Sequence, residues 1–155
     1  MSEAHEAHLH LLVCIDRLND ARQTLEAIVA NPGSPLIGPA FRYALVEYAT
    51  AFTRSDGQIK KHRRLPDSVV PIEHIALHGR VVSARHSIHA HADLKVLDAA
   101  LHVAHINGEN YVSRVQNHIT GLEELPQLEA VVAMVEAVLE NLYKLHEASE
   151  RNIAA

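Results

Sequence analysis

The sequence predicts a mostly α-helical bundle of about four main helices, in one domain that spans residues 1–155. Apolar residues recur at spacings of three and four over several long segments, as in helices that bury one face. A chain of 155 residues with 48% hydrophobic and 21% charged residues can bury a core without disulfides. Asn107-Gly108 lies between two partly alternating runs and predicts one exception, a β-hairpin inserted around residues 101–115.

The first two helices are bounded by local signals. Ser2 can cap an acid-rich first turn, and residues 31–33 (Asn-Pro-Gly) end the apolar repeat, so a helix is expected over residues 3–30. Pro39 suits the start of a second helix, which should stop before residues 56–57 (Asp-Gly). The apolar stripe expected on the second helix consists of Phe41, Leu45, Tyr48 and Phe52.

The remaining segments are less sharply bounded. A third helix is expected from near Ile72 towards Leu97, weakened at Gly79, where the small residue suggests close packing. A helical interpretation of residues 97–105 stays open. A last helix should start at Leu125 or Pro126 and present a broad apolar face. On the third helix, a narrow apolar seam consists of Leu77, Val81, Ala84 and Ile88.

Charge and cysteine content suggest the setting. The net charge of -5 argues against a general nucleic-acid coat protein, although cations gather between Arg42 and Arg85 and acids after Glu123. Cys14 is the only cysteine, so a reducing compartment is expected. The sequence shows no signal peptide and no run of about 20 apolar residues, so we expect a complete cytoplasmic protein with no membrane span.

The segment that carries candidate chemistry reads RHSIHAHAD, residues 85–93. Arg85, the polar His86 and, after four further residues, His91 resemble the motif of the HEPN family, which lies near the end of a helix. Ala92-Asp93 also resembles the small residue and acid that follow the motif in that family. Outside the motif the resemblance covers residues 39–150 in outline only: an apolar helix, a loop, the motif helix and a closing helix.

The resemblance implies an endoribonuclease that needs neither a metal nor another cofactor. It also implies a homodimer in which the Arg and His of the motif line a cleft between the subunits. Toxins and abortive-infection ribonucleases of this kind act on RNA, and a cognate antitoxin would be a further partner. Arg85 would then hold the phosphate and the transition-state charge, His91 would serve as general base or acid, and His86 would orient or assist. RNA binding through charge is expected from four residues of the basic loop, namely Lys60, Lys61, Arg63 and Arg64.

The spacing of the motif also bears on oligomeric state. On a straight helix Arg85 and His91 point about 120° apart, on either side of the apolar seam. Two copies packed along that seam would bring Arg85 of one subunit towards His91 of the other. A helix that bends near His89 would serve as well. We therefore expect a composite site in a homodimer.

Two other functions remain open. The chain could be a catalytically silent HEPN-like module that binds a nucleotide, RNA or a partner protein. Alternatively, its 13 histidines could make it a metal-binding helical bundle. No complete ligand set is visible in the sequence, so we assign no metal ligand. The histidines at suitable spacing are His74 with His78, His86 with His89, His89 with His91, and the N-terminal group of His5, His8 and His10.

Overall fold

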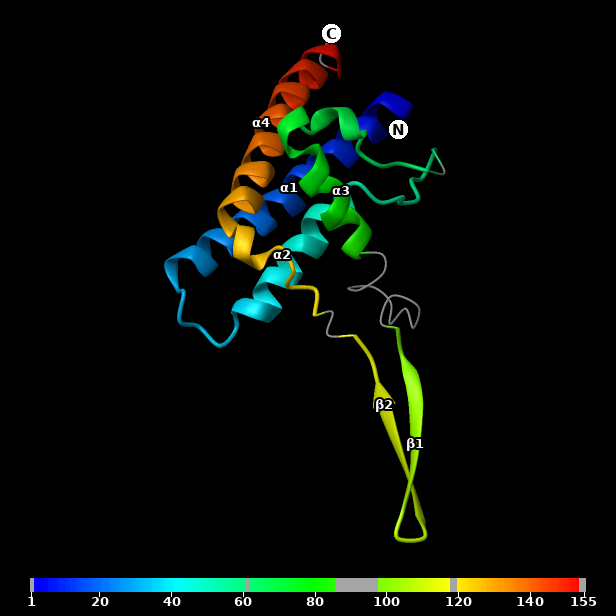
Figure 1. Cartoon of the computed structure of the whole chain (residues 1–155). Helices are drawn as coiled ribbons and strands as arrows, with labels where there is room; N and C mark the ends of the chain where they lie inside the picture. Colours follow the sequence, from blue (N-terminus) through cyan, green and yellow to red (C-terminus); the bar gives the residue numbers. More distant parts are fainter. Residues whose placement is uncertain (1, 61, 86–97, 118–119, 154–155) are drawn as a thin grey trace.

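The computed structural model describes residues 2–60, 62–85, 98–117 and 120–153. These residues form four α-helices and one two-stranded antiparallel hairpin, which confirms the predicted fold class (Figure 1). None of the helices in these ranges has the length and apolar character that crossing a bilayer requires.

Helix α1 (Glu3–Ala30) has the predicted bounds. The side chain of Ser2 accepts a hydrogen bond from the backbone N–H of His5, and Asn31 ends the helix by donating its side-chain amide to the carbonyl of Ala27. Such caps satisfy backbone groups that have no partner within the helix.

Helix α2 (Ile37–Ala51) begins two residues before Pro39 and ends earlier than expected. All four residues of the expected apolar stripe are buried. The helix stops because the carbonyl of Ala51 accepts the backbone N–H of Leu65 instead of continuing the helical pattern. Ser55 then pairs with Arg63 in an isolated antiparallel bridge, which folds the basic loop back on itself.

Helix α3 (Ile75–Ala84) follows a short 3₁₀ turn at Ile72–His74, close to the predicted start. The extension of this helix towards Leu97 lies mostly outside the described residues. Gly79 does not mark close packing, because a Cβ at this position would meet no atom within 4 Å.

The hairpin consists of β1 (Ala100–Ile106) and β2 (Glu109–Val115), so the helical interpretation is wrong from Ala100 onward. Asn107 and Gly108 have φ of 54° and 83°, as a type I′ turn requires. Figure 1 shows the hairpin projecting away from the helices. Its large apolar side chains are more than half exposed: Leu101, Val103, Ile106, Tyr111, Val112 and Val115.

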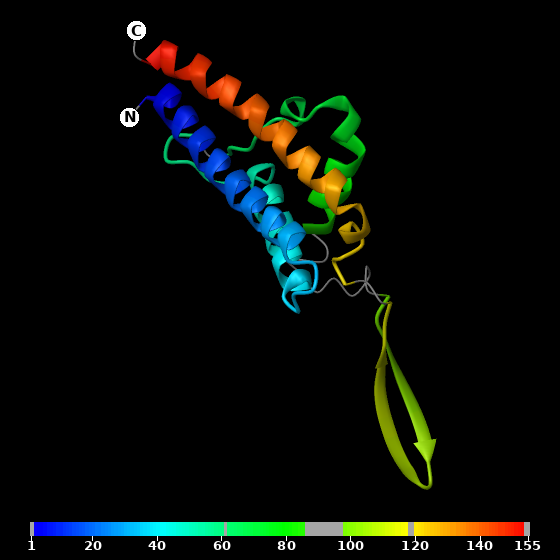
Figure 2. The ribbon, with the colours of Figure 1, turned by 90° about the vertical axis from the view of Figure 1, so that its left-hand side faces the viewer.

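Helix α4 (Leu128–Ile153) begins two or three residues after the predicted start at Leu125 or Pro126, because a 3₁₀ turn at Leu125–Gln127 precedes it. It runs antiparallel to α1, so the two chain ends lie side by side (Figure 2). The core between α1, α2 and α4 includes fully buried Leu18, Phe41, Tyr48, Met134 and Leu142.

Candidate functional site

Arg85 lies at the C-terminal end of α3, where it caps the helix. Arg85 is half-buried. Its Nε is shielded from solvent and has no hydrogen-bond partner in the described part of the chain. Arg80, five residues earlier, pairs with one carboxylate along one edge of its guanidinium: its Nε and Nη2 donate to the two oxygens of Glu124 at 2.6 and 3.0 Å. The two arginines therefore differ: among the described residues the Nε of Arg80 has an acceptor and the Nε of Arg85 has none.

His86 and His91, the other two predicted catalytic residues, lie outside the described residues. Of the apolar seam, the structure describes Leu77, Val81 and Ala84. Leu77 and Val81 are 7% and 0% exposed and belong to the core of their own chain, and Ala84 is half-buried. Leu77 and Val81 are therefore not available for a contact between two copies, whereas Ile88 lies outside the described residues, so packing of two copies along this seam stays a prediction.

The basic loop is held on α1 by the carboxylate of Glu6. Glu6 accepts the backbone N–H of Ile59 at 2.7 Å and of Lys60 at 3.0 Å, and it pairs with the guanidinium of Arg63 at 2.7 Å. Glycine is required at position 57, because a Cβ there would lie 2.7 Å from both the Glu6 carboxylate and the Lys60 carbonyl. From the sequence, Glu6 was expected only to be part of the acid-rich first turn of α1.

These contacts change the chemistry of Glu6. The N–H of Ile59 makes the largest contribution to lowering the pKa of this carboxyl group to about 2. Burial opposes the shift, and hydrogen bonds from the N–H of Lys60 and from the side chain of Arg63 reinforce it. Glu6 is therefore an anion at neutral pH that fixes the loop, and Arg63 contributes little free positive charge.

The cationic residues of this loop border a cleft of about 480 Å³. Its lining consists of Phe52, Thr53, Arg54, His62, Arg63, Arg64 and Val82. Arg54 and Arg64 are exposed, and Arg54 donates from Nε to Nδ1 of His62 at 2.6 Å. Arg54 and His62 were not among the predicted site residues, because their place in the cleft follows from the Ser55–Arg63 bridge.

Lys60 and Lys61 are the other two predicted RNA-binding residues that the loop contributes beside Arg63 and Arg64. Lys60 is exposed, and its Nζ lies 3.6 Å from a carboxylate oxygen of Glu3. Lys61 lies outside the described residues. The charge available in the cleft therefore comes mainly from Arg54 and Arg64.

The cleft reaches the motif helix through Val82. Val82 and Arg85 are three residues apart, so they share one face of the helix. An anion bound among Arg54, His62 and Arg64 would therefore lie on the side of α3 that carries the motif arginine.

His78 is a core residue and not half of a metal-binding pair with His74. Its Nδ1 lies 2.9 Å from the hydroxyl of buried Tyr48, and its ring packs edge-on against Phe52. Burial lowers the pKa of His78, although Asp67, 3.8 Å from its Nε2, acts in the opposite direction. A buried neutral imidazole with a fixed partner favours packing over catalysis.

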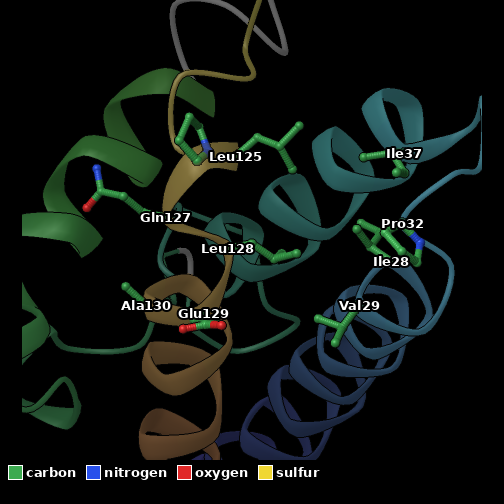
Figure 3. A pocket seen from close by; sticks show the side chains of 10 residues that line it. Ile28, Val29, Pro32, Ile37, Leu125, Gln127, Leu128, Glu129 and Ala130 are labelled. Atoms are coloured by element: carbon green, nitrogen blue, oxygen red, sulfur yellow. The ribbon is translucent and has the colours of Figure 1, made fainter.

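A second cleft, of about 710 Å³, lies where the end of α1 and the start of α2 face the start of α4. Figure 3 shows Leu128 pointing towards Ile28 across this cleft, with Pro32 and Ile37 on the same side as Ile28. Its lining is mostly apolar and offers Glu129 as a titratable group. It has the character of a binding groove and not of a catalytic site.

Comparisons with known protein families, with curated proteins and with solved structures find no match for this chain. The geometry of its own residues therefore carries the functional argument.

Proposed function

We propose that the chain is a HEPN-like endoribonuclease that cleaves RNA without a metal ion, with Arg85, His86 and His91 at its centre. The observation that supports this most is the basic cleft beside α3, which opens on the helix face that carries Arg85. A cleft with two exposed arginines suits a phosphodiester backbone, and the adjacent motif supplies groups for its cleavage.

We assign anion binding to Arg85 because its Nε has no hydrogen-bond partner among the described residues. A shielded donor without an acceptor costs about 1–3 kcal/mol, a cost that a bound phosphate oxygen would remove. A guanidinium stays charged at every physiological pH and can hold two phosphate oxygens at once. Arg85 would also stabilise the extra negative charge that develops on phosphorus in the transition state.

The histidines would carry the proton transfers. His91 would remove the proton of a ribose 2′-hydroxyl, whose oxygen then attacks the adjacent phosphorus. The bond from phosphorus to the 5′-oxygen breaks, and that oxygen takes up a proton from an imidazolium. The products are a 2′,3′-cyclic phosphate and a 5′-hydroxyl end, and no metal or redox partner is needed. His86 would orient the phosphate or assist the proton transfer.

A second copy of the chain would complete the site. Arg85 and His91 point apart on a straight helix, so one subunit would supply the arginine and its partner the histidine. Leu77 and Val81 are covered by their own chain, but the hairpin offers six large apolar side chains that are more than half exposed. An isolated two-stranded hairpin is marginally stable in water, and apolar patches of this kind usually mark an interface.

RNA cleavage by the purified protein in excess chelator tests the proposal. Wild-type protein should cleave single-stranded RNA, and Arg85→Ala and His91→Ala should each lower the rate by about 100-fold or more. Arg151→Ala and His5→Ala remove the same residue types from exposed positions on α4 and α1 and should leave the rate unchanged. Far-ultraviolet circular dichroism should show that each variant is folded.

The proposal fails if folded wild-type protein leaves RNA intact, or if the two motif variants cleave as fast as the two control variants. Activity that disappears with chelator would also contradict it, because the chemistry above uses no metal.

A further inference from the structure

A cluster of metal-ligating side chains lies where the two ends of the chain meet, at the far end of the helices from the hairpin (Figure 1). His8 comes from the start of α1, and His146 and Glu150 come from successive turns near the end of α4. One ligand atom of each side chain lies within 4.8 Å of the other two. Figure 2 shows the two helix ends side by side.

Neighbouring contacts orient the two imidazoles. The Nδ1 of His8 lies 2.9 Å from the hydroxyl of Ser149, which leaves its Nε2 for another partner. The ring centroids of His8 and His146 are 5.1 Å apart, and the Nε2 of His146 lies 3.5 Å from the carboxylate of Glu150. The Nδ1 of His146 is shielded from solvent and has no hydrogen-bond partner among the residues described.

The rest of the N-terminal histidine group does not take part. His10 lies with its ring nitrogens 3.8 and 3.9 Å from the sulfur of Cys14, and its Nε2 is 3.5 Å from the hydroxyl of Ser55. It therefore faces the basic loop, whereas His8 faces α4.

We propose that His8, His146 and Glu150 bind one divalent cation of the zinc class. Two imidazole nitrogens and one carboxylate oxygen are ligands that Zn²⁺, Co²⁺ and Ni²⁺ accept, whereas Mg²⁺ and Ca²⁺ prefer oxygen alone. The hydrogen bond from His8 to Ser149 is the outer contact that a metal-bound imidazole usually makes through its second nitrogen.

The geometry needs only a small adjustment. Ligand atoms of a tetrahedral zinc site lie about 3.3 Å apart, since each bond is about 2.0–2.2 Å, so the cluster must close by about 1.5 Å. The side chain of Glu150 is 60% exposed and can move. Three protein ligands leave a fourth position for a water molecule.

The ion would join the first turns of α1 to the last turns of α4. Chain ends fray unless they are held, and a ligand that binds only the folded state stabilises it. This role is independent of the proposed ribonuclease, which needs no metal and whose motif lies on α3.

A titration of the metal-free full-length protein with Co²⁺, followed by visible absorption and then by displacement with Zn²⁺, tests this site. Because the chain has 13 histidines, the informative quantity is the difference between variants. His8→Gln and His146→Gln keep a hydrogen-bonding side chain, and each should abolish binding of the one Co²⁺ equivalent that wild type binds most tightly. Glu150→Gln should lower the affinity for that equivalent at least tenfold. His102→Ala removes an exposed histidine of the hairpin and should bind as wild type does.

Thermal unfolding provides a second readout that does not depend on RNA cleavage. One equivalent of Zn²⁺ should raise the Tm of wild type and His102→Ala, and should leave that of His8→Gln and His146→Gln unchanged, whereas Mg²⁺ should change none of them. Equal Co²⁺ stoichiometry and affinity in wild type and in the three site variants would overturn the proposal.

Discussion

At the scale of single residues, Glu6 is the most constrained ionisable group that the structure describes. It is 4% exposed, yet it accepts two backbone N–H groups and an arginine. Loss of the Glu6 carboxylate would remove the acceptor that holds the basic loop on α1 and would leave the guanidinium of Arg63 without its counterion. Glu6 therefore stabilises the fold as an anion and loses this effect when it is protonated.

Glu6→Gln should lower stability at neutral pH, and the difference from wild type should shrink as pH falls. The pKa of Glu6 is lowered from 4.5 to about 2 in the folded protein, so its stabilisation is complete above about pH 4.5 and is lost towards pH 2. Urea unfolding from about pH 6 to about pH 3 measures this difference. A gap that stays constant over that range would contradict the assignment. Glu26→Gln, at an exposed pair with Arg22, should change stability little.

His78 should make stability fall at mildly acidic pH. Burial lowers the pKa of His78 below 6.5, so the unfolded chain binds the proton first, and stability falls as pH drops through that value. The free energy of unfolding should therefore decrease from about pH 7.5 to about pH 5.5, and less so in His78→Gln. An equal decrease in His78→Gln would assign the effect to other groups.

Residue contacts such as these could not be predicted from the sequence. Glu6 and Arg63 are 57 residues apart, and His8 and Ser149 are 141 apart. Spacing along the chain says nothing about such pairs, since tertiary packing alone brings them together. The histidine clusters proposed from local spacing illustrate this, because His78 bonds to Tyr48 and His8 faces α4.

At the scale of elements, local signals predicted most boundaries. Ser2 and Asn107-Gly108 act on the backbone within a few residues of themselves. Ser2 caps α1, and Asn107-Gly108 forms the turn of the hairpin, as predicted. The end of α2 was placed too late, because Ala51 exchanges its helical partner for Leu65, fourteen residues further on. A boundary set by such a tertiary hydrogen bond leaves no local trace.

Gly79→Ala should stabilise the protein by about 0.5–1 kcal/mol. Gly79 lies inside α3, is exposed, and has room for a methyl group with nothing within 4 Å. Alanine costs less backbone entropy there without new strain. Urea or thermal unfolding measures the change, and a loss of stability would show that glycine is needed at this position for another reason. RNA cleavage should be unchanged.

At the scale of the whole molecule, the helices and the hairpin differ in how they are stabilised. The helices share one core, whereas the hairpin projects from them with its apolar side chains in solvent (Figure 1). The sequence predicted both parts but not that Leu77 and Val81 are covered by their own chain, because an apolar seam looks the same whether its own chain or a second copy covers it. The proposed dimer contact must therefore lie outside these two residues.

Mixing Arg85→Ala with His91→Ala protein and measuring RNA cleavage in chelator tests the composite site most directly. If each site takes Arg85 from one subunit and His91 from the other, a heterodimer of the two inactive variants has one intact site. With free subunit exchange the mixture should recover about a quarter of wild-type activity. A mixture that forms heterodimers, as detected by differently tagged subunits, and remains as inactive as each variant alone would contradict the composite site.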